Sequence, residues 1–282
     1  MNLFKYADGD LKIHHNLDPV PAPETYQLHA HRTCELYYFI SGNGYYTVEG
    51  NDYDLVPGCL LVMRGGETHT PHIRTDAPYE RISINFSPDA LPLLQNEIEN
   101  IFMARPLGKN NMYVPSKDSA RFLAECMTRI CRDPLGNNVR AQALANLMPV
   151  LLELHHIKND TPLGEENIRI EAPSEGSSDL VAQIIEYINE NLTTIKGLEV
   201  LEQEFFFSKS YINRIFKEST GSSVWDYIVL KRLLLSRTLL QEGKQANIVA
   251  SQCGFCDYSS FYRQFKQRFG VSPIEAKKKA KS

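Results

Sequence analysis

Residues 29–42 read HAHRTCELYYFISG and hold the side chains in the first half of the chain that are best suited to chemistry. On an extended strand, four of them share one parity and are expected to point to one face: His29, His31, Glu35 and Tyr37. A further histidine, His69, ends the run GCLLVMRGGETH. Imidazole and carboxylate groups can bind a metal ion, contact a small molecule or hydrogen-bond one another, and these three alternatives stay open.

Residues 205–217 read FFFSKSYINRIFK and indicate a second kind of chemistry, in which polar donors alternate with apolar groups. With Ser208 as the N-cap of a helix, Ile212, Ile215 and Phe216 have helical spacing and form one apolar face. The opposite face presents hydrogen-bond donors from Ser210, Asn213, Arg214 and Lys217. The segment therefore predicts a helix that hides its hydrocarbon and exposes its donors.

A helix-turn-helix unit is predicted, because residues 198–205 have the spacing of a short helix and residues 206–207 form a turn before Ser208. The same unit occurs again 49 residues later without a gap. The matching positions are Arg214 and Arg263, Phe216 and Phe265, Lys217 and Lys266, Gly221 and Gly270, and Ser223 and Ser272. The second outward face consists of Ser259, Tyr262, Arg263 and Lys266. Two copies of one donor face argue for a surface that is used twice.

An apolar run at residues 224–240 separates the two units and predicts one helix about 25 Å long, at 1.5 Å per residue. Such a spacer suits two recognition helices in successive major-groove segments of DNA, roughly 34 Å apart, and a shorter one requires the duplex to bend. Charge supports a polyanionic partner for this half. Residues 179–282 contain 15 Lys and Arg against 11 Asp and Glu, whereas residues 1–178 contain 15 against 23.

The whole chain has 282 residues, 43% of them hydrophobic, so about two cores are expected. We expect domains at residues 1–158 and 179–282, joined by a linker at residues 159–178 that is rich in Pro, Gly, Ser and acidic residues. Short runs rich in Tyr, Val, Ile and Phe at residues 24–86 predict antiparallel strands in a sandwich or barrel. No apolar run has membrane length, and six sparse cysteines fit a reducing compartment, so we expect a cytoplasmic protein with no membrane partner.

The run GFCDYSSFYRQFKQRFGVSP at residues 254–273, with SKSYINRIFKESTG in the first unit, resembles the AraC/XylS group of bacterial transcription regulators. The resemblance implies that bases are read by Ser210, Asn213, Arg214, Tyr258, Ser259, Tyr262 and Arg263. It places Lys209, Lys217 and Lys266 at phosphates, which position the protein but do not specify sequence. Glu202, Phe206 and Ser236 depart from the group's pattern, so the first unit is expected to read DNA less strongly than the second.

The pattern HxHxxxExxxxxxG followed by GxxH resembles the two motifs of the cupin barrel, which regulators of the same group often have at this end. In metal cupins these positions bind one divalent ion, so the resemblance makes His29, His31, Glu35 and His69 candidate ligands for Zn, Fe, Mn or Ni. The second motif is incomplete, because Arg64 stands where a Pro is expected and Ile73 where metal cupins often have Asn. A cavity that contacts an effector without a metal, or plain structural hydrogen bonding, remains the alternative.

These observations favour a ligand-responsive transcription factor, not an enzyme, with an α+β architecture: a cupin-like β-barrel with dimerisation helices and an all-α domain of two helix-turn-helix units. The effector site is expected at His29, His31, Glu35, Tyr37 and His69, and a sugar would suit the aromatic faces of Tyr37, Tyr45 and Tyr46. Helices at residues 116–131 and 138–158 are expected to form a homodimer, with RNA polymerase as a further partner of an activator. The rival hypotheses are a metal-dependent cupin enzyme with a helical appendage and an architectural DNA-binding protein.

Overall fold

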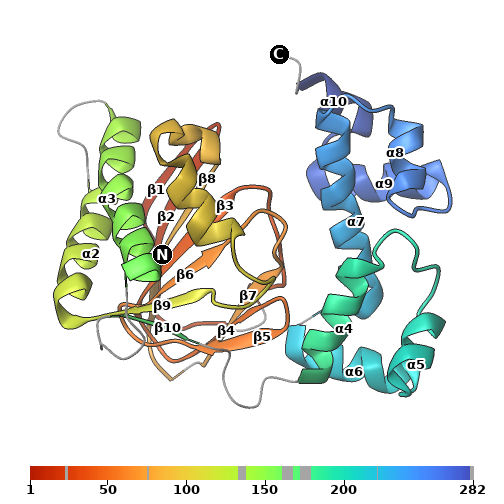
Figure 1. Cartoon of the computed structure of the whole chain (residues 1–282), viewed down its shortest axis with the longest axis horizontal. Coiled ribbons are helices and arrows are strands. Elements are labelled where there is room, and N and C mark those ends of the chain that lie inside the picture. Colours follow the sequence, from red (N-terminus) through yellow and green to blue (C-terminus); the bar gives the residue numbers. More distant parts are fainter. Residues whose placement is uncertain are drawn as a thin grey trace. The chain divides into compact units, whose positions relative to one another are not determined.

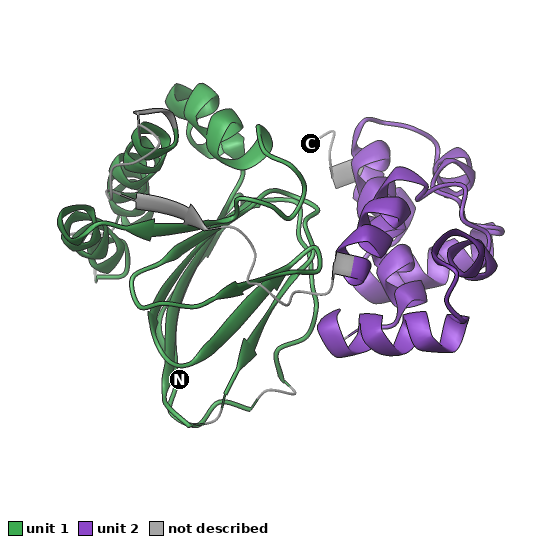
Figure 2. Ribbon diagram, turned by 60° about the horizontal axis from the view of Figure 1, so that its bottom comes forward, with its two compact units in different colours: residues 1–177 green, residues 178–282 purple. Residues whose placement is uncertain are grey.

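The computed structural model describes residues 1–22, 25–74, 76–132, 138–160, 168–171, 179–220 and 222–279. The chain divides into two compact units, Met1–Ser177 and Ser178–Ser282 (Figure 2). Unit 1 is built from β-sheets and a small number of helices, and unit 2 is helical (Figure 1). The predicted fold class is confirmed. None of the described helices combines the length and apolar character that a membrane span requires.

Unit 1 contains two antiparallel sheets. The larger has the strand order β1 (Asn2–Asp8), β2 (Leu11–Asp18), β8 (Tyr79–Phe86), β3 (Cys34–Ser41), β6 (Leu60–Met63), β9 (Met112–Pro115) and β10 (Ile168–Glu171). The smaller has the order β5 (Asn51–Asp54), β4 (Gly44–Val48) and β7 (His69–Ile73). The central strands β3 and β6 are rich in apolar residues because both of their faces are buried, and β3 carries one charged exception, Glu35.

Strand β3 shows how the two faces divide. Leu36 and Tyr38 belong to the core under the helices, whereas Tyr37 and Phe39 belong to the core that also contains side chains of the smaller sheet. Because side chains alternate along a strand, Glu35 lies on the same side of the sheet as Tyr37. A carboxylate is thereby placed in the interior between the sheets, where burying it demands partners.

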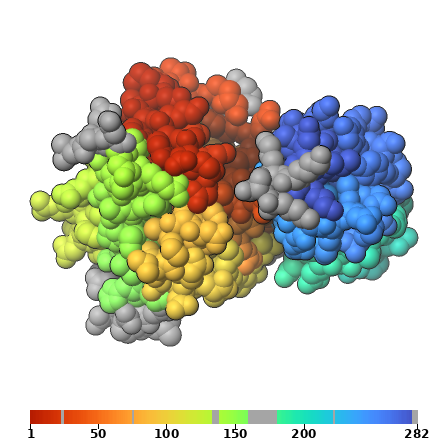
Figure 3. Space-filling view, turned by 90° about the horizontal axis from the view of Figure 1, so that it is seen from above, coloured from red at the N-terminus to blue at the C-terminus, as the bar shows by residue number. Residues whose placement is uncertain are grey.

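The outer face of the larger sheet is covered by helices. The helices α2 (Lys117–Ile130) and α3 (Val139–Asp160) confirm the predicted pair, and α3 continues through Pro149. A segment of short helices packs against α3: η2 (Pro88–Ala90), η3 (Pro92–Leu94), α1 (Gln95–Ile98) and η4 (Glu99–Met103). Figure 3 shows this segment, in yellow, beside the green surface of α3.

The prediction of a linker over residues 159–178 is wrong in two places. Residues up to Asp160 continue α3, and Ile168–Glu171 form β10, which pairs antiparallel with β9. The alternation of apolar and charged residues in IRIE is a strand pattern, which the surrounding Pro, Gly and acidic residues concealed. The rest of the linker lies outside the described residues, so the domain bounds stay predictions.

Unit 2 contains the two expected helix-turn-helix units. The helices are α4 (Asp179–Glu190), α5 (Glu199–Phe205), α6 (Lys209–Thr220), α7 (Val224–Gln241), α8 (Ala246–Gln252), α9 (Tyr258–Phe269) and α10 (Pro273–Lys279). The pairs α5–α6 and α8–α9 are the two units, and the apolar helix α7 joins them as predicted.

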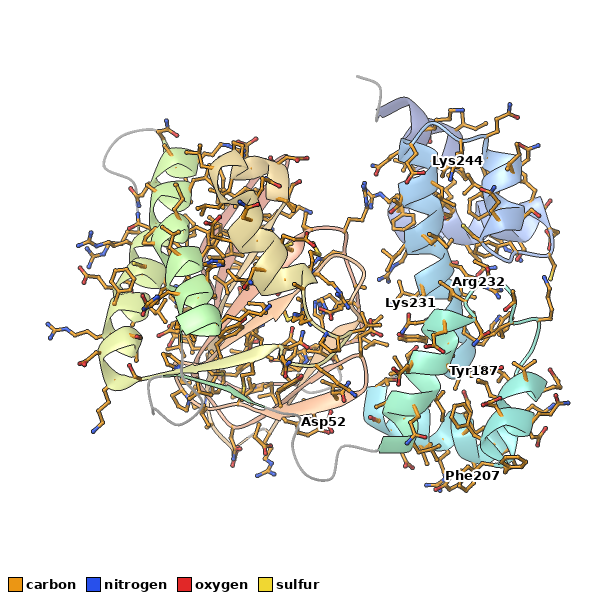
Figure 4. The ribbon with its side chains drawn as sticks, viewed as in Figure 1. Asp52, Tyr187, Phe207, Lys231, Arg232 and Lys244 are labelled. Atoms are coloured by element: carbon orange, nitrogen blue, oxygen red, sulfur yellow. The ribbon has the colours of Figure 1, made fainter. Side chains whose placement is uncertain are left out.

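Arg232 lies in the middle of α7 and is only 3% exposed (Figure 4). Its Nε donates to the carbonyl of Leu192 at 2.9 Å, its Nη1 to Gly254 at 2.9 Å and its Nη2 to Ile195 at 2.5 Å. The first and third carbonyls follow α4, and the second belongs to the turn before α9. One guanidinium therefore connects the central helix α7 to the loop after α4 and to the turn before α9. The apolar pattern of residues 224–240 did not predict this contact.

Candidate functional site

Glu35 is the centre of a polar cluster in the interior of unit 1. His31 Nε2 contacts its Oε2 atom, and His69 Nε2 lies 3.3 Å from the same oxygen. Asn85 Nδ2 donates to Glu35 Oε2 and faces His31 Nε2, both at 2.9 Å. Asn85 is the direct neighbour of Glu35 across β3 and β8. The sequence alone does not point to Asn85, because only the strand register reveals the pairing.

The fold brings the predicted residues His29, His31, Glu35 and His69 together, but not all through the single strand that was expected. Strand β3 begins at Cys34, so His29 and His31 do not share a regular strand with Glu35. His29 instead forms an isolated bridge with His69, and His31 sits before the bend that leads into β3. The strand-parity argument holds for Glu35 and Tyr37 alone.

Each histidine of the cluster turns its Nδ1 atom to a backbone carbonyl. The partners at 2.9 Å are Gln27 for His29, Thr33 for His31 and Glu67 for His69. A carbonyl only accepts, so we assign the Nδ1 proton to all three rings. The Nε2 atoms of neutral rings then carry lone pairs, which is the arrangement that metal-binding histidines show.

The donor set fits a divalent cation chemically. His29, Glu35 and His69 each offer one ligand atom, and these atoms lie within 4.8 Å of one another. Imidazole and carboxylate ligands suit Zn, Fe, Mn or Ni alike. Arg64, which departs from the cupin pattern, takes no part, since it donates to the carbonyls of Met103 and Arg105.

Electrostatics makes Glu35 and His69 a charged pair and keeps the His29 ring neutral. Burial alone would raise the pKa of Glu35, but the neighbouring rings of His31 and His69 outweigh it and hold the pKa well below its usual value. Burial opposes charge on His69 too, yet contact with Glu35 raises its pKa. Burial, with the neighbouring His69, lowers the pKa of His29 to about 4. Any cation bound here would displace the proton of His69.

His69 Nε2 is fully buried and has no well-aligned hydrogen bond in the described part of the chain. It lies 3.3 Å from Glu35 Oε2, which is close enough for an ion pair, but the two groups are not aligned for a hydrogen bond. A buried polar atom left in this way is costly unless another group binds it.

Aromatic rings line one side of the cluster. The ring of Tyr46 lies 6.1 Å from that of His69 and 4.7 Å from that of Tyr37, and the hydroxyl of Tyr37 meets that of Tyr79. Tyr45 lies elsewhere, stacked on His72 at 4.5 Å, because neighbouring residues of β4 point to opposite faces. The expected sugar-binding trio is therefore reduced to Tyr37 and Tyr46.

The first predicted DNA-reading face lies on α6. Its apolar residues Ile212 and Phe216 are buried, and the hydroxyl of Ser208 caps the helix by accepting from the Tyr211 N–H at 3.3 Å. Three of the predicted contact residues are exposed, namely Ser210, Arg214 and Lys217, while Lys209 is half-buried.

Asn213 differs from the expectation of a free, outward residue. It is half-buried, and its Oδ1 accepts the backbone N–H of Val224 at 3.0 Å. Asn213 therefore holds the first residue of α7 against α6, and its amide oxygen is already used within the fold.

The second predicted face lies on α9 and follows the expectation closely. Asp257 caps the helix, with Oδ1 accepting from the Ser260 N–H at 2.7 Å, and Phe261 and Phe265 fill the core. The outward residues are exposed in four cases, Tyr258, Ser259, Arg263 and Lys266, and half-buried in the case of Tyr262.

Two family models match the chain. Residues 22–151 match the AraC-like ligand binding domain, and residues 201–279 match a helix-turn-helix domain. The chain belongs to the AraC family of transcriptional regulators. The resemblance inferred from the duplicated motif is thereby confirmed.

Among relatives of this AraC-family chain, the Msm operon regulatory protein of Streptococcus mutans is 24% identical over 246 residues, which cover 86% of the chain and 83% of that protein. The transcriptional regulatory protein HptR of Staphylococcus aureus is 33% identical over 101 residues, and the chain spans only 40% of its length. ToxT of Vibrio cholerae is similar in structure, with a TM-score of 0.41 and 14% identity over 96% of this chain and 97% of that one. These named sequence relatives are regulators, which favours regulation over the rival hypothesis of a metal-dependent enzyme.

Proposed function

We propose that this AraC-family chain is a promoter-binding regulator controlled by a small polar effector that binds at the Glu35 cluster. The observation that supports the effector site most directly is the fully buried Nε2 atom of His69, which lacks an aligned partner among the described residues. A ligand hydroxyl placed there would complete its hydrogen bonding. His31, whose side chain is 25% exposed, marks the edge of the cluster that lies nearer to solvent.

A carbohydrate fits the chemistry of the cluster. The carboxylate of Glu35 accepts from hydroxyl groups, the histidine nitrogens can donate or accept, and the rings of Tyr37 and Tyr46 offer apolar faces. The proposed effector contacts are His29, His31, Glu35, Tyr37 and His69, to which the structure adds Asn85 as a neighbour.

Promoter DNA is the proposed partner of the helical unit. The bases would be read by Ser210, Asn213 through its remaining amide group, Arg214, Tyr258, Ser259, Tyr262 and Arg263, and the phosphates would be contacted by Lys209, Lys217 and Lys266. A homodimer through α2 and α3, where Phe122 and Leu152 are exposed, would raise affinity through effective concentration. An activator of this kind would also contact RNA polymerase.

Control requires that the effector bind more tightly to one DNA-binding state of the protein than to another. The test uses the full chain, whose thermal unfolding is followed with a panel of mono- and disaccharides. A binder at one hundred times its Kd stabilises by about 2.7 kcal/mol, and Glu35→Gln should abolish that shift. A shift of equal size in Glu35→Gln would place the ligand elsewhere, and no shift with any sugar would refute the carbohydrate.

A second candidate is a divalent cation as the effector or its anchor. The specific observation in its favour is that three neighbouring histidines all direct Nδ1 to carbonyls. Metal analysis of the purified chain, with His69→Gln and Glu35→Gln as variants, tests this. Stoichiometric metal lost in both variants would support it, and metal retained in both would refute it.

A further inference from the structure

The turn of the first helix-turn-helix unit exposes aromatic rings that no core contact explains. Phe206 is 90% exposed, and Phe207 and Tyr211 are 42% and 37% exposed. The rings of Phe207 and Tyr211 stack at 5.0 Å, and the Arg214 guanidinium lies 5.2 Å from the Tyr211 ring. Figure 4 shows Phe207 projecting from the end of this helix pair. We call Phe206, Phe207 and Tyr211 the aromatic surface.

Phe206 also has a strained backbone. Its φ of +57° lies in the left-handed region, which bulky residues rarely adopt and which glycine adopts without cost. In the turn of the second unit the left-handed residue is a glycine, Gly254 at φ +83°, one position before the residue that the 49-residue repeat pairs with Phe206. A ring that is both strained and exposed does not serve the fold, and such outliers point to a function.

The first unit lacks the net charge to bind DNA through phosphates alone. Residues 199–220 contain three Lys and Arg against four Asp and Glu. Two of the cations are paired within the unit, Lys209 with Glu199 at 2.9 Å and Arg214 with Glu218 at 3.2 Å.

The second unit is different. Residues 246–269 contain three Lys and Arg against one Asp. Arg263 and Lys266 are exposed and have no carboxylate within ion-pair distance in the described part of the chain. The two copies of the unit therefore offer DNA different physical means of attachment.

The position of the aromatic surface indicates its occupant. It flanks the N-terminal end of α6, the end from which recognition helices of this type contact base edges. It is also continuous with Arg214. The only apolar group that a base pair presents in the major groove is the thymine C5-methyl.

We propose that Phe206, Phe207 and Tyr211 contact thymine methyl groups in the major groove, so that the first unit selects sequence by apolar contact while the second supplies the salt-dependent affinity. This inference rests on the proposed DNA-reading function. An exposed aromatic set could also dock on a protein, and that occupant is an outcome of the test.

The test begins with the full chain selecting its preferred duplex from a random-sequence pool. Each thymine of the selected duplex is then replaced by uracil, which removes only the methyl group, and affinity is measured by fluorescence anisotropy. We expect one or two positions at which uracil weakens wild-type binding about fourfold, the value of one buried methyl group. In Phe206→Gly the same replacement should weaken binding less, because the ring that the methyl group would contact is already absent and the two losses of binding energy are not additive.

Two controls separate the contact from folding and from charge. Phe206→Gly should unfold at a higher temperature than wild type, because glycine suits the left-handed turn, so weaker binding cannot reflect unfolding. Lys266→Ala should lower affinity and reduce the salt slope by about 0.9, while leaving the thymine-to-uracil ratio unchanged.

Equal affinity for thymine and uracil at every position, or an unchanged ratio in Phe206→Gly, would overturn the inference and leave the aromatic surface to a protein partner. Failure of the full chain to select any sequence would instead overturn the proposed promoter-reading function, and the inference with it. The two failures are thus distinguishable.

Discussion

The guanidinium of Arg232 in α7 donates to the carbonyl of Gly254 at 2.9 Å, across the boundary between the central helix and the second helix-turn-helix unit. Its other donors reach the loop after α4, which packs with the first unit through α6. A single buried side chain therefore couples the positions of α6 and α9, the helices proposed to read DNA. Rigid spacing matters because two recognition helices must fit one duplex together.

Arg232→Met should destabilise the helical unit by about 3 kcal/mol, because it removes the donor from three carbonyls, those of Gly254 and Ile195 buried and that of Leu192 partly buried. Arg232→Lys should fare little better, since an ammonium cannot reproduce the planar fork of donors. Denaturant unfolding of the full chain measures this. Wild-type stability in both variants would show that water replaces the guanidinium at no cost.

Gly254→Ala tests the same contact from the other side. At φ +83° an added Cβ would lie 2.6 Å from the Thr193 carbonyl oxygen and 2.9 Å from the Arg232 guanidinium carbon. The matched control is Gly270→Ala, where φ is +69° but the space is open. The control should lose about 1 kcal/mol of stability from its backbone alone, and Gly254→Ala should lose clearly more. Equal losses would mean that the crowding is relieved by small shifts.

The helix-turn-helix units could be predicted from the sequence because their signals are local. Helical spacing and a cap, Ser208 in one unit and Asp257 in the other, each lie within one short segment, and the duplication is visible when the two segments are compared. Arg232 could not be predicted, because one cation in an apolar helix gives no periodic signal and its partners are distant carbonyls. The contact between Asn213 and Val224 could not be predicted for a similar reason, since only the fold brings the Val224 N–H to the Asn213 amide oxygen.

The polar cluster of unit 1 shows an intermediate case. The residue types predicted that Glu35 and the histidines would lie together. The strand that was expected to align them begins only at Cys34, so it does not include His29 or His31. His31 arrives through a bend and Asn85 through strand pairing, and neither is visible in the spacing of residues. Composition likewise concealed β10 within a presumed linker.

Asp18 should make the stability of unit 1 depend on pH. Its carboxylate accepts from Arg81 at 2.5 Å and from the Tyr26 hydroxyl at 2.8 Å. Burial would raise the pKa of Asp18, but these two partners outweigh it and lower the pKa. The stabilisation is therefore present above the unfolded pKa, about 3.9, and is lost as pH falls through the folded value.

The measurement compares wild type with Asp18→Asn at several pH values. At pH 7 the variant should be less stable by roughly 1.5–3 kcal/mol, the usual contribution of a hydrogen bond to a charged group. The difference should shrink as the pH is lowered toward 3. A difference that stays constant would show that shape, not charge, makes Asp18 important.

Arg263 and Lys266 should separate specificity from affinity in the second unit. Both are exposed on α9 and lie within one turn of each other, but guanidinium can grip guanine through two bonds, whereas an ammonium acts on phosphate as a point charge. Arg263→Ala should cost about 1–3 kcal/mol on the preferred duplex and relax the choice of base at one position, while Lys266→Ala should weaken all sequences alike. Binding of the full chain to a panel of duplexes that each differ at one base pair distinguishes base reading from phosphate contact. A uniform loss for Arg263→Ala would assign it to the backbone, and the base-reading role would then fall to Tyr258, Ser259 and Tyr262.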